Sequence, residues 1–139
     1  GIGVARAHLE WMEDSENDLM VSKETLKVDK AYNWACFQAQ QAAEKSVKAV
    51  LIGIGEHPYL HSIRELLGDL SMKTGRALHD LEECAERLDL YYVPPRYPNA
   101  HGGRATYKIY GRGVAHEAVE CAERIVSRMR SLLAELRPE

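Results

Sequence analysis

Apolar residues recur every three or four positions along most of this chain, the spacing that places them on one face of an α-helix. Four segments show this pattern, and no segment alternates with the period of two that a half-buried strand requires. A fifth segment, near the C-terminus, shows it without interruption, at Val114, Ala118, Cys121, Ile125, Met129, Leu132 and Leu136. The sequence therefore predicts an all-α protein, an antiparallel up-and-down bundle of about five helices.

The limits of the first two predicted helices follow from their caps and interruptions. The first covers about residues 4–27, and its apolar face is broken at Ser15 or Glu16. The second begins near Asp29, a residue type that caps helix N-termini well, and ends at Gly53.

The later helices carry similar marks. The third opens with Ser-Ile-Arg-Glu at residues 62–65, a capping-box pattern in which the serine and the glutamate each bond to the other's backbone N–H. The fourth covers about residues 78–88, and the fifth about residues 114–136. Short links between these helices favour antiparallel neighbours.

Length and composition favour one ordinary domain with a packed core. The chain has 139 residues, of which 45% are hydrophobic, and its net charge of −3 argues against a wholly basic nucleic-acid binder. The longest apolar run, residues 49–55, is too short to span a bilayer, and no signal peptide is evident, so we expect a cytoplasmic protein without a membrane segment. The cysteines lie in helical patterns, which predicts small buried side chains in a reducing cytosol rather than a disulfide or a metal site; they are Cys36, Cys84 and Cys121.

The long connection at about residues 92–111 differs in composition from the helices around it. The stretch 88–112 holds three of the five prolines and five of the seven tyrosines. It also carries four basic residues and, after Asp89, no acid until Glu117. A bundle needs only a short link here, and extra loop length is typical of a functional site. The alternative is a proline-stiffened connector whose tyrosines pack on the bundle and whose charges face water.

Arg96 and His101 in this connection are the candidate catalytic pair. An arginine can bind a phosphate through two parallel hydrogen bonds, and a histidine can accept or donate a proton near neutral pH. Together they suffice for metal-independent RNA cleavage, with the imidazole as base for the 2′-hydroxyl and the guanidinium stabilising charge on the phosphate. Tyrosine rings can stack on bases, and basic side chains attract phosphates. The residues expected to bind a nucleotide or RNA are Tyr92, Arg96, Tyr97, Asn99, Arg104, Lys108 and Lys48.

No metal or cofactor is expected. His57 and His61 have the spacing of zinc ligands on a helix, but Pro58 breaks the turn between them. The acidic run at residues 10–18 is expected to be a solvated helix face.

Two stretches of the chain resemble the HEPN domain family. Residues 34–70 contain Gln-Ala-Ala-Glu-Lys at Gln41–Lys45 and a histidine near the start of the third helix. Residues 88–100 contain Tyr-x-Pro-x-Arg-Tyr-Pro. The resemblance extends over nearly the whole chain and implies a single HEPN domain over residues 1–139, folded as an antiparallel helical bundle.

The resemblance also implies a homodimer and a minimal nucleotidyltransferase partner, often in a toxin–antitoxin module. Many members of the family are ribonucleases with an arginine and a histidine a few residues apart, two copies of which meet across the dimer. Arg96 and His101, with four residues between them, match that spacing. Tyr97 stands where the ribonucleases have a polar residue, and Pro98 disfavours the helix on which their motif lies. This form is more similar to the nucleotide-binding branch.

Three functions follow from these observations. The first is nucleotide or RNA binding at the long loop, alongside a minimal nucleotidyltransferase. The second is metal-independent RNA cleavage by Arg96 and His101. The third is a non-catalytic interaction subunit whose helix faces dock a partner, in which case substitutions in the loop would have no effect.

Overall fold

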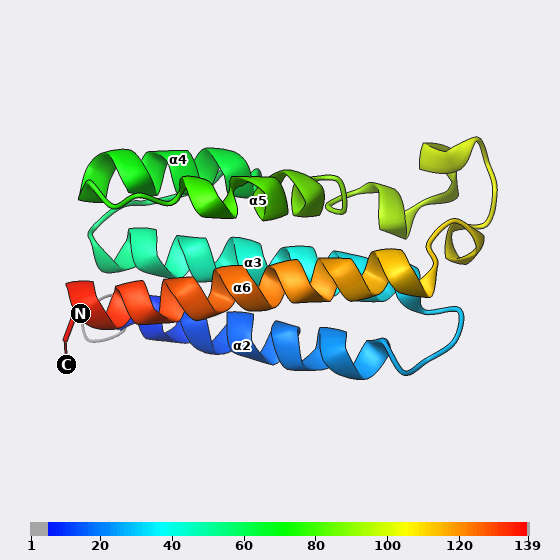
Figure 1. The fold of residues 1–139 in the computed structure, drawn as a ribbon, viewed down its shortest axis with the longest axis horizontal. Coiled ribbons are helices and arrows are strands. Elements are labelled where there is room, and N and C mark those ends of the chain that lie inside the picture. Colours follow the sequence, from blue (N-terminus) through cyan, green and yellow to red (C-terminus); the bar gives the residue numbers. More distant parts are fainter. Residues whose placement is uncertain (1–5, 139) are drawn as a thin grey trace.

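A computed structural model describes residues 6–138, and five α-helices form the body of that part of the chain (Figure 1). They are α2 (Ala7–Thr25), α3 (Tyr32–Gly53), α4 (Ile63–Thr74), α5 (Glu82–Asp89) and α6 (Arg112–Leu136). The short 3₁₀ turns are η1 (His79–Leu81), η2 (Pro94–Arg96), η3 (Pro98–His101) and η4 (Thr106–Lys108). The prediction of an all-α helical bundle is confirmed, and residues 6–138 contain no strand.

The central helix is α3, which packs between α2 and α6 (Figure 1). Its small residues Ala39, Ala42 and Ala43 are fully buried, and they let the neighbouring backbones approach closely. Larger side chains of α6 and α4, such as Ile125, Met129 and Leu70, fill the remaining core. From Ala118 to Leu132, the stepped apolar stripe that the sequence shows in α6 therefore faces this core, whereas Val114 is exposed.

Helix α4 runs in the same direction as α3, as two side-chain contacts between the two regions show. His61, just before α4, contacts Glu44 in the middle of α3, and Lys73 at the end of α4 pairs with Glu56 just after α3. The linker 54–62 therefore runs back along α3 before α4 begins (Figure 1). This return path places His61 beside α3 rather than at the end of the bundle.

The helix limits agree in part with the sequence. Ser62 caps α4, and its hydroxyl accepts a hydrogen bond from the backbone N–H of Glu65 at 3.2 Å, as the capping-box pattern predicts. The predicted cap at Asp29 is wrong, because α3 begins at Tyr32 after Ala31 and has no side-chain cap. Residues 26–31 instead form the turn between α2 and α3. The predicted start of the first helix near residue 4 lies outside the described residues.

The cysteine prediction is wrong for two of the three residues. Cys84 on α5 and Cys121 on α6 form a disulfide, with their Cα atoms 5.1 Å apart, whereas Cys36 is a free, buried thiol. Each partner occupies an ordinary apolar position of its own helix, so only the packing of α5 on α6 brings the two together. Burial raises the pKa of the Cys36 thiol to about 12.

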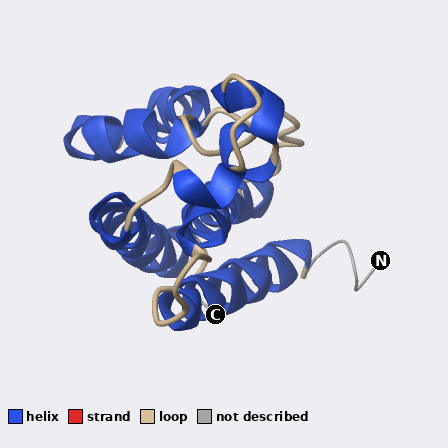
Figure 2. Cartoon of the chain, turned by 90° about the vertical axis from the view of Figure 1, so that its right-hand side faces the viewer, coloured by secondary structure: helices blue, strands red, loops and turns tan. Residues whose placement is uncertain are grey.

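The long connection leaves α5 and returns to α6 at one end of the bundle (Figure 1). It contains three 3₁₀ turns and no α-helix, as proline at residues 94, 95 and 98 favours. Figure 2 views the molecule from this end. Of the helices between residues 6 and 138, none combines the length and the apolar character needed to cross a membrane.

Candidate functional site

Arg96 is held at the end of η2 by its own loop and by α3. Its Nε donates a hydrogen bond to the backbone carbonyl of Tyr92 at 2.8 Å. Its guanidinium carbon lies 4.3 Å from the ring centre of Phe37 on α3, and 5.0 and 5.6 Å from those of Tyr92 and Tyr97. Stacking on aromatic faces suits the planar, weakly hydrated guanidinium group. Arg96 is partly exposed, so this cage fixes its position without closing it off from solvent.

His101 ends η3 and is anchored through one ring nitrogen. Its Nε2 lies 2.8 Å from the carbonyl oxygen of Pro94 and 3.2 Å from the hydroxyl of Tyr110. A carbonyl oxygen can only accept, so Nε2 carries the proton and Nδ1 is the basic nitrogen. Burial raises the pKa of Tyr110 to about 12.

The same short backbone segment therefore positions both members of the predicted pair. The carbonyl of Tyr92 holds Arg96, and the carbonyl of Pro94, two residues further on, holds His101. Two residues of chain span at most about 7 Å, so both anchors lie within one turn of the loop. Asn33 on α3 supports that turn, because its buried side chain donates a hydrogen bond to the carbonyl of Pro95 at 3.0 Å.

The other predicted binding residues fall into three groups. Tyr92 and Tyr97 lie against the Arg96 guanidinium. Asn99, Arg104 and Lys108 are exposed further along the connection, and the Lys108 ammonium lies 6.0 Å from the ring centre of Tyr107.

Lys48 lies apart from the loop. It is buried in α3, with its ammonium 2.9 Å from the carboxylate of Glu44 and 5.8 Å from the ring centre of Trp11. The structure gives it the role of a buried partner of Glu44 rather than that of an exposed phosphate-binding group.

A buried polar network that the sequence reasoning missed lies under the loop. Glu44 accepts hydrogen bonds from Gln40 at 2.9 Å, from Lys48 at 2.9 Å and from Nδ1 of His61 at 3.1 Å. The His61 ring in turn stacks on the Tyr92 ring, with centres 4.5 Å apart and planes 18° from parallel. The spacing of Glu44 and Lys48 was visible in the sequence, but nothing local marked this face of the helix as buried.

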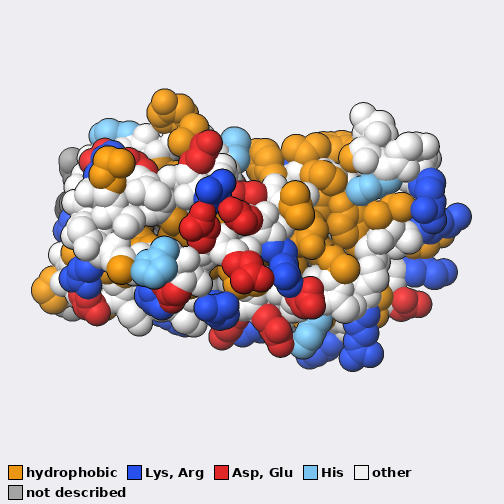
Figure 3. All heavy atoms as spheres, turned by 45° about the horizontal axis from the view of Figure 1, so that its top comes forward, with side chains coloured by type: hydrophobic (Ala, Val, Ile, Leu, Met, Phe, Trp, Pro, Cys, Tyr) orange, Lys and Arg blue, Asp and Glu red, His pale blue; other side chains and the backbone are white. Residues whose placement is uncertain are grey.

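The surface around the connection combines apolar and basic groups. Figure 3 shows hydrophobic side chains gathered on the right-hand half of the face that it displays, with lysine and arginine side chains at the right-hand edge. The exposed apolar residues of the connection and its flanking helices include Leu90, Val93, Tyr97 and Val114. Residues 6–138 contain no cluster of histidine, cysteine or acidic side chains that could hold a metal ion.

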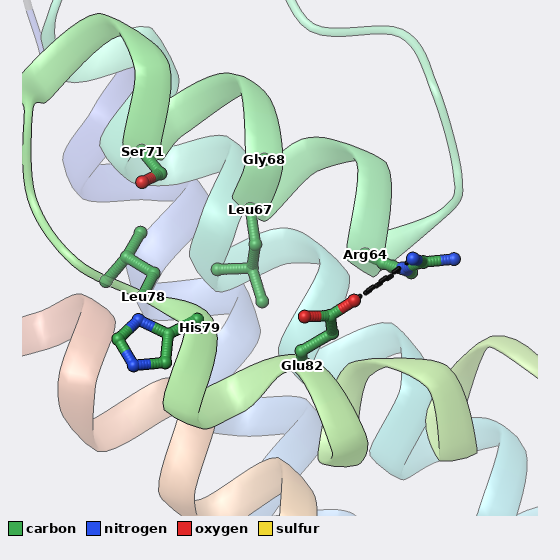
Figure 4. Close-up of a pocket in the computed structure, with 7 residues that line it drawn as sticks. All are labelled: Arg64, Leu67, Gly68, Ser71, Leu78, His79 and Glu82. Atoms are coloured by element: carbon green, nitrogen blue, oxygen red, sulfur yellow. Dashed lines mark hydrogen bonds and ion pairs between the residues drawn. The ribbon is translucent and has the colours of Figure 1, made fainter.

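A separate pocket of about 300 Å³ lies between α4 and α5, away from the connection (Figure 4). Leu67 and Leu78 line it with apolar side chains, and a Cβ on Gly68 would meet no atom within 4 Å. Its arginine, Arg64, is already paired with Glu82 at 3.0 Å, so the lining offers little net charge to an anionic ligand.

Comparison with known proteins identifies the family of this chain. The family model of the HEPN domain matches residues 8–132, which is most of the chain. The chain belongs to the HEPN domain family. Membership of this family accounts for the helical bundle.

The HEPN relatives include proteins of bacteria and archaea. The curated protein "Putative toxin MJ1304" of Methanocaldococcus jannaschii is 29% identical over 97% of this chain and 93% of its own length. The crystal structure of TT1696 from Thermus thermophilus is 36% identical and has a TM-score of 0.85, covering 91% of this chain and 98% of that one. ST0689, an archaeal HEPN homologue, is 33% identical with a TM-score of 0.75, covering 91% of this chain and 97% of that one. A HEPN domain protein from Thermotoga maritima is 32% identical with a TM-score of 0.70, covering 90% of this chain and 98% of that one.

Proposed function

We propose that this HEPN protein binds RNA at the connection between α5 and α6 and acts in a toxin-type module. The observation that carries the proposal is the arrangement of Arg96, whose guanidinium is fixed by Phe37, Tyr92 and a backbone carbonyl while remaining partly exposed. Because this arginine side chain is already held in one position, it loses less conformational entropy when it binds a phosphate. The similarity to a protein named as a toxin supports the same direction.

The surrounding residues suit a single-stranded nucleic acid. Arg104 and Lys108 add positive charge that attracts phosphates, and Tyr97 and Tyr107 expose ring faces on which bases stack. Asn99 adds an exposed hydrogen-bonding amide. A free nucleotide shares this chemistry, so competition by nucleotides against an RNA oligonucleotide separates the two ligands.

The test is RNA binding by fluorescence anisotropy, in EDTA, with a labelled single-stranded RNA oligonucleotide. Arg96→Ala is expected to weaken binding about tenfold or more, because it removes a fixed, charge-assisted phosphate contact. Arg130→Ala is the matched control, since Arg130 is exposed on α6 and pairs with Glu16 on α2. Equal affinities for the wild type and both variants would contradict the proposal.

Metal-independent RNA cleavage is the second candidate function, favoured by the geometry of His101. Its bond to the Pro94 carbonyl leaves Nδ1 as the nitrogen that can take the proton of a 2′-hydroxyl. The test is cleavage of the same oligonucleotide in EDTA, with His101→Ala beside His116→Ala, a change at an exposed histidine on α6. Cleavage should survive EDTA and be lost only in His101→Ala. Equal cleavage by both variants would contradict a role for His101.

The proposal also includes partners and a location. We infer a homodimer, a minimal nucleotidyltransferase partner and action in the cytoplasm, where RNA targets are found. The exposed apolar residues Leu90 and Val114, which flank the loop at the end of α5 and the start of α6, support a protein contact at this end. If the protein is instead a non-catalytic interaction subunit, substitutions at these two residues will abolish a complex while loop substitutions leave it intact.

A further inference from the structure

Glu44 is a buried carboxylate with an unusually complete set of partners. Only 4% of the residue is exposed, and its two oxygens accept from Gln40, Lys48 and His61. A buried carboxylate is stable when it is paired and hydrogen-bonded in this way. These partners come from one face of α3 and from the linker, so the position of Glu44 is fixed by the core of the bundle.

His61 is the one member of this network that reaches solvent. Its side chain is 53% exposed, whereas the side chains of Glu44 and Lys48 are each 6% exposed. Because the carboxylate accepts from Nδ1, that nitrogen carries a proton and Nε2 is the nitrogen free to exchange one. A carboxylate that orients an imidazole through Nδ1 is the arrangement by which histidines are positioned for proton transfer.

Tyr92 contacts both His61 and the predicted phosphate-binding group, Arg96. The imidazole stacks on the ring of Tyr92, and the Arg96 guanidinium lies 5.0 Å from the centre of that same ring. The backbone carbonyl of Tyr92 also holds Arg96. Tyr92 therefore connects His61 to Arg96, and His101 is anchored two residues further along the same backbone.

We propose that His61 is a second catalytic histidine, oriented by Glu44, which protonates the leaving group in RNA cleavage. This role rests on the cleavage function proposed above, for which His101 is the base, and it adds the acid that protonates the leaving group. In the reaction, Nδ1 of His101 takes the proton of the 2′-hydroxyl, and the 2′-oxygen forms a bond to phosphorus. The bond from phosphorus to the 5′-oxygen breaks, and that oxygen takes a proton from Nε2 of His61 in its imidazolium form. The products are a 2′,3′-cyclic phosphate and a 5′-hydroxyl end, and solvent restores both histidines.

A purely structural role makes a different prediction for the same residue. If His61 only packs against Tyr92, its loss misplaces Arg96 and weakens every reaction at the site equally. If His61 donates a proton, its loss matters only for a leaving group that needs one. A substrate with an activated leaving group therefore separates the two roles.

The experiment compares an RNA oligonucleotide with uridine 3′-(p-nitrophenyl phosphate), both in EDTA. The p-nitrophenolate leaves without a proton, whereas the 5′-oxygen of RNA needs one. His61→Asn can keep the hydrogen bond to Glu44, and His61→Phe can keep the ring on Tyr92, but neither can transfer a proton. His57→Asn, at an exposed histidine in the same linker, is the matched control.

Both His61 variants are expected to melt as cooperatively as the wild type and to cleave RNA about 100-fold or more slowly, the usual contribution of a positioned acid. Both are expected to release p-nitrophenolate at the wild-type rate, whereas His101→Ala loses both activities. Wild-type RNA cleavage by either variant, or an equal loss on both substrates, would overturn the proposal. A wild type that binds RNA but cleaves neither substrate would also overturn it, while leaving the RNA-binding function intact. A wild type that neither binds nor cleaves would reject both.

Discussion

Ser15 lies where the apolar face of α2 is interrupted, yet it is fully buried. Its hydroxyl donates a hydrogen bond of 2.6 Å to the carbonyl of Ala42 on α3. A small polar residue thus allows the two helices to approach, and the hydrogen bond offsets the cost of burying its hydroxyl. The residue that weakens the helical pattern in the sequence is therefore a specific contact between the two helices.

Replacing Ser15 tests this contact. Ser15→Ala should lower the free energy of unfolding by about 1 kcal/mol, because it removes one buried hydrogen bond. Ser15→Leu should lower it by about 1–3 kcal/mol, because the larger side chain overpacks the interface. Urea unfolding followed by circular dichroism measures both. Ser131→Ala, at an exposed position of α6, is the control that should change nothing.

Polar groups at the two ends of the short helix α5 add to the attachment that its buried side chains and its disulfide provide. Asp89, its last residue, accepts hydrogen bonds from the hydroxyl of Ser62 at 2.9 Å and from the backbone N–H of Ile63 at 2.7 Å. It therefore completes the cap of α4 from another helix, which stabilises the positive end of that helix dipole. At the other end, just before α5, Asp80 meets Arg128 of α6 at 2.6 and 3.2 Å.

The pair of Asp80 and Arg128 should make stability depend on pH. Hydrogen bonds from Arg128 hold the pKa of Asp80 below its ordinary value of 3.8. A lowered pKa in the folded state stabilises the fold above that ordinary value, and this contribution disappears as the pH falls through the folded-state pKa. Asp80→Asn should therefore lower the unfolding temperature at neutral pH, and the difference from the wild type should shrink in acid.

Thermal unfolding at a series of pH values from about 7 down to about 2 measures this convergence. Glu83→Gln is the control, since the Glu83 side chain is 90% exposed and 3.9 Å from its partner Arg87. A constant difference between Asp80→Asn and the wild type across the series would show that the ion pair does not carry the effect.

Over the whole molecule, the disulfide between Cys84 and Cys121 closes a loop that contains the whole connection between α5 and α6. The two cysteines are 37 residues apart in sequence, and Arg96 and His101 lie between them. The two helices that flank the candidate site are therefore joined covalently, and α3 supports the connection, because Phe37 and Asn33 contact η2 and its arginine.

Reducing this disulfide should lower the free energy of unfolding by about 4 kcal/mol, because the unfolded chain then regains the entropy of an open loop. The measurement is urea unfolding with and without dithiothreitol. A double variant, Cys84→Ala with Cys121→Ala, should unfold at the same urea concentration in both conditions. A wild type whose midpoint is unchanged by dithiothreitol would contradict the prediction.

Cys36 should stay unmodified by iodoacetamide until the protein unfolds, because burial raises its pKa to about 12.

The sequence by itself determined the features that depend on neighbours along the chain. Residue spacing and backbone preferences within a few positions predict the apolar face of α6, the cap at Ser62 and the end of α3 at Gly53. The position of the long connection between helices follows in the same way, from its prolines and tyrosines.

Only the tertiary structure decided which distant residues meet. Three contacts join residues from different elements. They are the disulfide, the stacking of Arg96 on Phe37, and the hydrogen bond between Glu44 and His61. The path of the linker 54–62 back along α3 brings His61 to Glu44, and no local preference encodes that path. Side-chain chemistry is a property of the residue, but burial and contact are set by packing free energy summed over the whole bundle.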